Sequence, residues 1–237
     1  MNITFFEQLE VALATERLGA YRQDKADEVT TLARYLLNMA LCESLYSPLQ
    51  FAEVALRNAV HASLCDRFDS EGWYDAIPSG KLLPWQAKQI IAAKDKLARD
   101  DKTENPGRII AELHFGFWTG FFNRRHARTG LGFALTNSVF SGAPKSERAL
   151  ANLDARWNRI RILRNRVFHH ERILHWTDLD DQHRALLQVT GWISPELREL
   201  ADALDRYTQI RSEGLSPWIE QIQNHWPQTR VGHNLDD

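Results

Sequence analysis

The chain has few of the residues that cross-link a fold or bind zinc. Its 237 residues include only two cysteines, Cys42 and Cys65. Each lies in an apolar, helix-like segment with no metal-type partner nearby. A disulfide scaffold or a cysteine-based zinc site does not fit this pattern, and we expect free core cysteines in a reducing compartment.

Long apolar runs are also missing. The longest candidate, "FGFWTGFF" from Phe115 to Phe122, is far shorter than the roughly 20 residues that a membrane-spanning helix needs. The N-terminus carries two acids and no basic cluster before its apolar residues, so it does not resemble a secretory signal. The sequence therefore predicts a cytoplasmic protein with no membrane partner.

An excess of positive charge is absent as well. The formal net charge is -2 and the pI is about 6.5. The chain as a whole is not a basic nucleic-acid binder, so any nucleic acid would have to be held by a local patch.

Strand signals are absent, and helical periodicity takes their place. There is no sustained period-2 alternation and no Asn-Gly or Asp-Gly turn. We predict an all-α fold in a single domain over 1–237, with 227–237 as a flexible tail. The expected helices are Ile3–Leu18, Asp24–Leu45, a segment restarting at Ser47-Pro48 and ending near Phe68, Pro84–Asp101, Arg108–Phe122, a helix after Leu150, Thr177–Trp192 and Ser194–Arg211.

The segment "DARWNRIRILRNRVFHHER", from Asp154 to Arg172, is rich in arginine and contains no lysine. A planar guanidinium suits phosphate, and it stays charged near neutral pH. The run therefore indicates either a local electropositive stripe or an ordinary solvated helix face. Its arginines are Arg156, Arg159, Arg161, Arg164, Arg166 and Arg172.

A helical wheel separates these arginines. An apolar stripe is formed by Leu153, Trp157, Ile160, Leu163 and Val167. Arg164 lies at the edge of this stripe, so we expect it to be partly buried and to need an anion or acceptors. Asn165 and His169 share one face, whereas Arg164 and His169 are about 140° apart on a regular helix. Either the helix bends or ends near Phe168, or two copies of the segment meet in a dimer.

The stretch "HHERILH" also invites a zinc interpretation. It contains His169, His170, Glu171 and His175. The metalloprotease pattern requires His-Glu-x-x-His, with both histidines on one helix face, but the histidine after His170-Glu171 comes five residues on. We therefore expect no metal and no other cofactor here.

Acid–base chemistry on RNA is the alternative. A histidine titrates near neutral pH and can move a proton, and an arginine can stabilise the extra charge of the transition state. RNA carries its own nucleophile in the 2′-hydroxyl, so such a site needs no metal.

The string "RNRVFHH" also resembles the R-x4–6-H motif of HEPN domains (higher eukaryotes and prokaryotes nucleotide-binding). The wider sequence is similar to the Abi-like branch, the abortive-infection proteins of bacteria. The resemblance rests on three stretches in the family's order: "LQFAEVALRNAVHASL" (Leu49–Leu64), "ELHFGFWTGFF" (Glu112–Phe122) and "LRNRVFHHERILH" (Leu163–His175).

That resemblance implies an all-α HEPN-type bundle with additional helices. It also implies a homodimer with facing motifs and, often, a metal-independent ribonuclease that acts as a toxin or anti-phage effector, sometimes with an antitoxin or regulatory partner. Arg164 and His169 would be the catalytic ends of the motif, and Asn165 the polar residue that follows the arginine. His170 and Glu171 would support them.

A second constellation lies in "EVALRNAVH". Glu53, Arg57 and His61 are spaced by four along an otherwise apolar helix. They predict either a buried salt-bridged network that fixes helix packing or a wall of the active site. Gly116 and Gly120 in "GFWTG" are also four apart, which indicates close helix packing beneath the aromatic residues or a dimer surface.

Two other functions stay open at this point. A catalytically silent HEPN module would bind RNA, a nucleotide or a protein partner without cleaving it. A purely structural helical protein would leave Arg164 paired to an internal acid.

Overall fold

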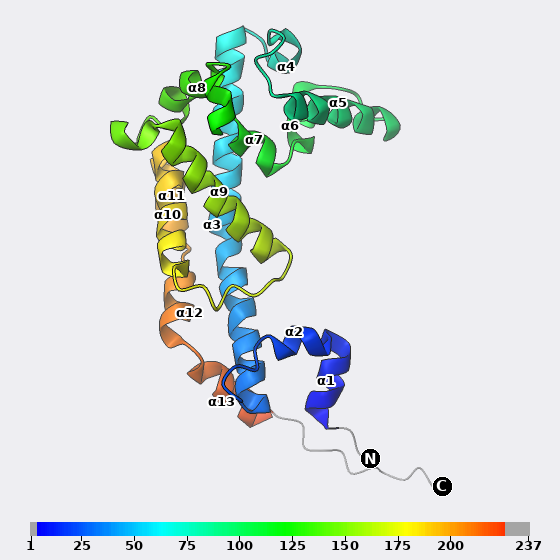
Figure 1. Cartoon of the computed structure of the whole chain (residues 1–237), viewed down its shortest axis with the longest axis vertical. Helices are drawn as coiled ribbons and strands as arrows, with labels where there is room; N and C mark the ends of the chain where they lie inside the picture. Colours follow the sequence, from blue (N-terminus) through cyan, green and yellow to red (C-terminus); the bar gives the residue numbers. More distant parts are fainter. Residues whose placement is uncertain (1–3, 226–237) are drawn as a thin grey trace. The chain divides into compact units, whose positions relative to one another are not determined.

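The computed structural model describes residues 4–225, and over this range the fold is all-α with no strand (Figure 1). The described chain divides into two compact units. Unit 1 contains residues 4–45, 166–177 and 205–225, and unit 2 contains residues 46–165 and 178–204. No helix in the described range is long and apolar enough to cross a bilayer. The tail expected at 227–237 lies outside the described residues.

Unit 1 is built around one small apolar core. The buried residues Phe6, Leu18, Leu32, Ala33 and Ile222 form its centre. Helix α1 begins with a capping box, in which the Thr4 hydroxyl accepts from the Glu7 backbone and the Glu7 carboxylate accepts from the Thr4 backbone. The helices that belong wholly to this unit are α1 (Phe5–Leu13), α2 (Thr15–Gly19), α12 (Tyr207–Glu213) and α13 (Ser216–His225).

Unit 2 has a large aromatic core. Phe117 contacts Trp73, Trp85, Trp118 and Phe121, with ring centroids 5.0–6.5 Å apart. The helices that belong wholly to it are α4 (Trp73–Ala76), α5 (Pro84–Arg99), α6 (Pro106–Glu112), α7 (Phe115–Gly120), α8 (Leu131–Val139), α10 (Leu179–Ile193) and α11 (Pro195–Ala203), with the 3₁₀ turns η1 (Arg124–Ala127) and η2 (Lys145–Arg148).

Of the two glycines predicted to allow close helix packing, Gly116 and Gly120, only Gly120 lies beneath an aromatic ring from another helix. A methyl group at Gly120 would lie 2.6 Å from two ring carbons of Trp85, so the indole packs directly on the backbone of α7. Close packing beneath the aromatic residues is therefore confirmed at Gly120. A methyl group at Gly116 would instead meet the ring of His114, at 3.1 Å.

Two helices contribute to both units: α3 (Glu28–Phe68) and α9 (Leu150–Phe168). The predicted restart at Ser47-Pro48 is wrong, because α3 runs through Pro48 without interruption. Proline in a helix interior removes one hydrogen bond and costs about 3 kcal/mol. The apolar stripe through Leu41, Leu45, Leu49 and Ala52 is at least 98% buried, and burial on both sides of the proline outweighs that local preference.

Two other predicted helices are each divided. The segment Ile3–Leu18 breaks at Ala14, which has a φ of 69°, so α1 and α2 are separate helices. The segment Arg108–Phe122 breaks at Leu113 and His114, where the backbone is extended. The indole Nε1 of Trp118 donates to the Leu113 carbonyl at 3.2 Å and satisfies the acceptor that the break leaves.

A polar group lies inside the aromatic core of unit 2. His126 is fully buried, and its Nε2 lies 2.6 Å from Gln86 Oε1. The Gln86 amide nitrogen donates to the Phe117 carbonyl, so its oxygen faces the ring and the proton of His126 sits on Nε2. The Nδ1 of His126 lies 3.0 Å from the Thr129 hydroxyl. Burial lowers the pKa of His126 to about 4.

This histidine gives the fold a pH-dependent stability. His126 in the unfolded chain titrates near 6.5 and in the folded chain near 4, so between these values acid protonates only the unfolded state. Above pH 6.5 the neutral His126 makes its full contribution to the free energy of unfolding. As the pH falls from 6.5 toward 4, that free energy decreases by up to about 3 kcal/mol. Urea unfolding across this range should show the stability gap between wild type and His126→Gln shrinking as the pH falls. A gap that is constant with pH would contradict the assignment.

Candidate functional site

Helix α9 carries the predicted arginine-rich segment, and its apolar face is as expected. The five stripe residues Leu153, Trp157, Ile160, Leu163 and Val167 are at most 3% exposed. Arg164 lies at the edge of this stripe, with 29% of its side chain exposed. The prediction that Arg164 is partly buried and needs an acceptor is therefore confirmed.

The acceptor is Glu53, on helix α3. Arg164 Nε donates to Glu53 Oε2 at 3.3 Å, and 26% of the glutamate side chain is exposed. An arginine at the rim of an apolar stripe is held by a carboxylate, as the cost of burying an unpaired charge requires. This pair joins two stretches of unit 2 that lie 111 residues apart in the sequence.

His114, in the break between α6 and α7, interacts electrostatically with the Arg164–Glu53 pair. Partial burial of its ring lowers the pKa of His114, and the charges of Arg161 and Arg164 lower it further, while Glu53 opposes them. The site of a methyl group on Gly116 lies 3.1 Å from the His114 ring and 3.9 Å from Arg161 Nη1. The side chains of Glu53, His114, Arg161 and Arg164 thus form one cluster within unit 2, named here the Arg164 cluster.

Sequence reasoning missed His114 as a member. The only signal was its position in "ELHFGFWTGFF", one of the three stretches singled out for their resemblance. No spacing rule joins it to Arg164, because their electrostatic interaction depends on how the α6–α7 break packs beside α9.

The remaining arginines of α9 are mostly neutralised. Arg156 pairs with Glu147 at 3.0 Å and stacks over the Trp192 ring, and Arg159 pairs with Asp178 at 2.6 Å. Arg161 donates to the neutral Asn158 side chain at 2.8 Å. The predicted electropositive stripe is therefore largely compensated by carboxylates, and most of it behaves as a solvated helix face.

The predicted line of Glu53, Arg57 and His61 does not form an ion-pair network. Glu53 pairs with Arg164, and the buried Nε of Arg57 has no hydrogen-bond partner among residues 4–225. His61 Nδ1 accepts from the indole Nε1 of Trp73 at 3.0 Å, and burial lowers the pKa of His61. The spacing of four placed the residues on one side of α3 but did not decide their partners.

His169, the second predicted catalytic residue, directly follows the end of α9. The helix ends at Phe168, so the alternative in which it ends near this residue is confirmed. The His170 amide donates to the Val167 carbonyl at 3.1 Å, and the Glu171 amide donates to the Arg166 carbonyl at 2.9 Å. This is the Schellman arrangement, with His170 at φ 56° where glycine is usual. His169 is exposed at the C-cap.

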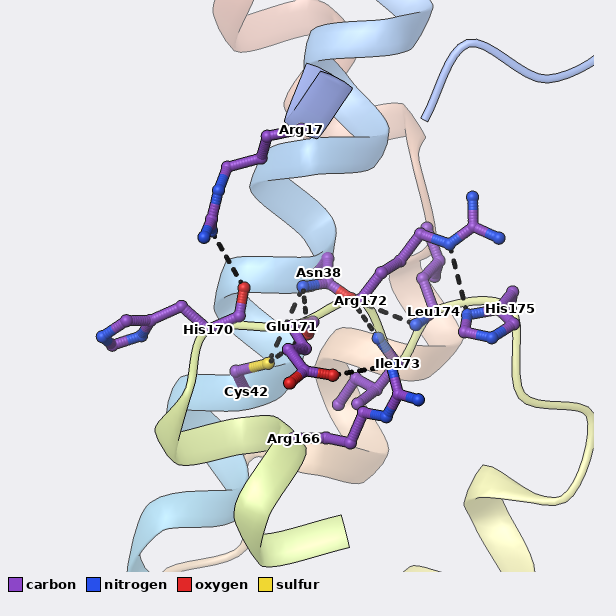
Figure 2. A network of polar contacts seen from close by, with 10 residues as sticks. All are labelled: Arg17, Asn38, Cys42, Arg166, His170, Glu171, Arg172, Ile173, Leu174 and His175. Atoms are coloured by element: carbon purple, nitrogen blue, oxygen red, sulfur yellow. Dashed lines mark hydrogen bonds and ion pairs between the residues drawn. The ribbon is translucent and has the colours of Figure 1, made fainter. Parts of the chain in front are cut away.

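A buried amide holds the segment that follows (Figure 2). Asn38, on the unit 1 part of α3, is 3% exposed. Its Oδ1 accepts from the Ile173 and Leu174 amides at 2.8 and 3.1 Å, and its Nδ2 donates to the Glu171 carbonyl at 3.4 Å. We name this set of three bonds the Asn38 clamp. A lone asparagine in the apolar run "LLNMAL" was its sequence signal.

Further side chains brace the same turn. The His170 carbonyl accepts from Arg17 Nη1 at 3.0 Å (Figure 2). Glu171 pairs with Arg166 at 2.7 Å, and Arg172 donates to the Ala20 carbonyl and to His175 Nδ1. Glu171 and the His170 backbone are thus engaged in shaping the turn. Within residues 4–225, no group of three or more His, Cys, Asp or Glu side chains is placed to hold a metal ion.

The boundary between the units falls between Asn165 and Arg166. Arg164 and the exposed Asn165 belong to unit 2 with the Arg164 cluster, and His169 belongs to unit 1 with the Asn38 clamp. Comparison of the chain with protein-family models, with curated proteins and with solved structures gives no match.

The Asn38 clamp predicts a large loss of stability on Asn38→Ala. The substitution removes the three bonds of the clamp and the bond from Asn38 Nδ2 to Cys42 Sγ, and it leaves the amide of the fully buried Ile173 without its acceptor. We expect the free energy of unfolding to fall by about 2–4 kcal/mol in urea titrations. The matched control is Asn58→Ala, at an exposed asparagine on the same helix, with an expected change below about 0.5 kcal/mol. Equal effects of the two substitutions would contradict the clamp.

Proposed function

We propose that this chain is a metal-independent endoribonuclease of HEPN type, acting in bacterial abortive infection or as a toxin. One observation supports the proposal above all others. The three stretches whose sequences resemble the Abi-like proteins each supply one ionisable side chain to the Arg164 cluster: Glu53, His114 and Arg164. A resemblance of three separate stretches does not by itself require that their side chains lie together in the fold.

The chemistry follows from the side chains. Arg164 stabilises the charge that develops on the phosphate, and His169 moves a proton to or from the RNA oxygens. The 2′-hydroxyl attacks the adjacent phosphorus, the 5′-oxygen leaves with a proton, and a 2′,3′-cyclic phosphate remains. Asn165 orients the substrate beside Arg164. His170 and Glu171 shape the turn that carries His169, and Arg57 and His61 support α3.

The second candidate is a catalytically silent module that binds RNA, a nucleotide or a protein partner. One specific contact favours it: Arg164 is already paired with Glu53, which is also what a purely structural role would require. In the enzyme, by contrast, Glu53 fixes the direction of the guanidinium, and the phosphate competes with the carboxylate for it. Activity measurements on Arg164 and His169 separate the two.

The first functional prediction concerns cleavage. Incubated with total tRNA and mRNA in EDTA, wild type should produce fragments with 2′,3′-cyclic phosphate ends. Arg164→Ala and His169→Ala should each lower the rate at least about 100-fold, the usual size of losing one such group. The matched controls are Arg159→Ala, on the same helix, and His225→Ala, at the exposed end of α13.

Circular dichroism and thermal melts verify that the variants fold. Cleavage that stops in EDTA and returns with a divalent ion would refute the metal-independent mechanism. RNA left intact by wild type would favour the silent module.

The second functional prediction concerns assembly. We propose a C2 homodimer in which Arg164 of one chain acts beside His169 of the other, because the resemblance to HEPN domains implies facing motifs and two-fold dimers are the commonest soluble oligomers. Light scattering behind a sizing column should give twice the chain mass of 27.4 kDa. Mixing the inactive Arg164→Ala and His169→Ala chains should restore part of the activity, since one site of each heterodimer is intact. A monomer that cleaves at full rate when dilute would exclude the composite site.

A further inference from the structure

Three exposed arginines without a side-chain partner lie together, away from the predicted motif. The turn η1 and the residue after it carry Arg124, Arg125 and Arg128, all exposed. None of the three forms an ion pair or a side-chain hydrogen bond with any of residues 4–225. Arg156, Arg159 and Arg164, by contrast, are each held by a carboxylate. Three exposed and unpaired positive charges are therefore close together in the chain at this turn.

The turn is fixed from within. His126 is fully buried between the exposed arginines and bonds to Gln86 and Thr129. The Asn123 side chain accepts from the Arg125 amide at 2.9 Å, and it donates to Asp154 at 3.2 Å. Because the backbone is held at both ends, only the arginine side chains have to be ordered when a ligand binds.

A cavity of about 450 Å³ lies directly beyond the turn. It is lined by Thr129, Gly130 and Leu131, by the cations Arg67 and Lys81, and by the ring of Phe68. Its volume is within the range of small-ligand pockets. Lys81 also donates to the Thr129 carbonyl at 2.9 Å, so this cation is anchored to the chain segment that bears the arginines.

We propose that Arg124, Arg125 and Arg128 bind the sugar-phosphate backbone of single-stranded RNA, and that the neighbouring cavity accepts one base beside Phe68. The polymer class is taken from the proposed function, and the binding surface is separate from the Arg164 cluster. Single-strand binders combine cations that track the phosphates with aromatic rings for the bases. Arginine also suits phosphate better than lysine, because its fork donates two parallel hydrogen bonds.

The local charges agree with this choice. Asp66 and Asp69 flank Arg67 at the end of α3 and reduce its contribution, so the three arginines of the turn carry most of the attraction. The net charge of -2 gives an anionic polymer no general attraction to the chain, so local unpaired cations decide where it binds. A polyanion should therefore bind in one place, with strong dependence on salt.

The test measures binding without cleavage. A labelled 2′-O-methyl RNA of about 12 nucleotides, within the site size of single-strand binders, has no 2′-hydroxyl and cannot be cut. Fluorescence anisotropy in EDTA, from about 50 to 200 mM salt, should give a slope of log affinity against log salt that is lower by about 2 in the triple variant Arg124→Ala, Arg125→Ala, Arg128→Ala, with at least about tenfold weaker binding at the low end.

The matched control removes the same net charge from arginines that are already paired. Arg159, Arg184 and Arg198 pair with Asp178, Asp181 and Asp202, all in unit 2. Replacing these three by alanine should leave the slope nearly unchanged. The triple lysine variant at 124, 125 and 128 should retain most of the slope and lose affinity only modestly, which separates charge from any effect on folding.

The outcomes are distinct. Equal losses in the alanine and control triples would overturn the proposal, because net charge alone would then explain them. Binding of the wild type to anionic lipid vesicles but not to RNA would overturn it in favour of a membrane surface. Arginine-dependent binding of the uncleavable RNA, with natural RNA left intact, would support this surface while refuting the proposed ribonuclease.

Discussion

The ion pair between Arg164 and Glu53 is the contact on which the candidate site depends. It joins α3 to α9 within unit 2 and keeps a guanidinium at the rim of an apolar stripe. Its strength is set by its partial exposure, because water screens both groups while the surrounding apolar surface restricts their movement. Under the proposed function, the phosphate of the RNA exchanges with the carboxylate at this fixed and incompletely buried arginine.

The arginines of the chain differ in whether a nearby carboxylate neutralises them. Most arginines on helix α9 are compensated by nearby acids, whereas those on the η1 turn are not. Counting basic residues along the sequence selects the first group, because it is denser. The ion pairs in the structure instead favour the η1 arginines as the site for a polyanion, because only uncompensated charge attracts a polyanion over distance.

Helical periodicity predicted much of this fold. The buried stripe of α9, the Pro84 start of α5 and the all-α class followed from spacing and capping. Local signals failed where tertiary burial decided the result. The helix α3 continues through Pro48, where a break was predicted, and the predicted helix Arg108–Phe122 breaks at Leu113, where none was predicted. In the site, the partial burial of Arg164 was predictable from its angle on the wheel. Its partner and the approach of His114 were not, because they depend on packing between segments distant in sequence.

The order in which the two units acquire their residues has a consequence for synthesis. Unit 2 is complete once residue 204 has been made, but the core of unit 1 includes Ile222 as well as Phe6, Leu18 and Leu32. The first half of that core therefore leaves the ribosome long before the helix α13 that covers it. During this interval the core of unit 1 lacks the apolar residue that α13 contributes to it. A chain that stops before α13 would keep the complete unit 2 segments and an unfinished unit 1, so premature termination does not release two independently folded halves.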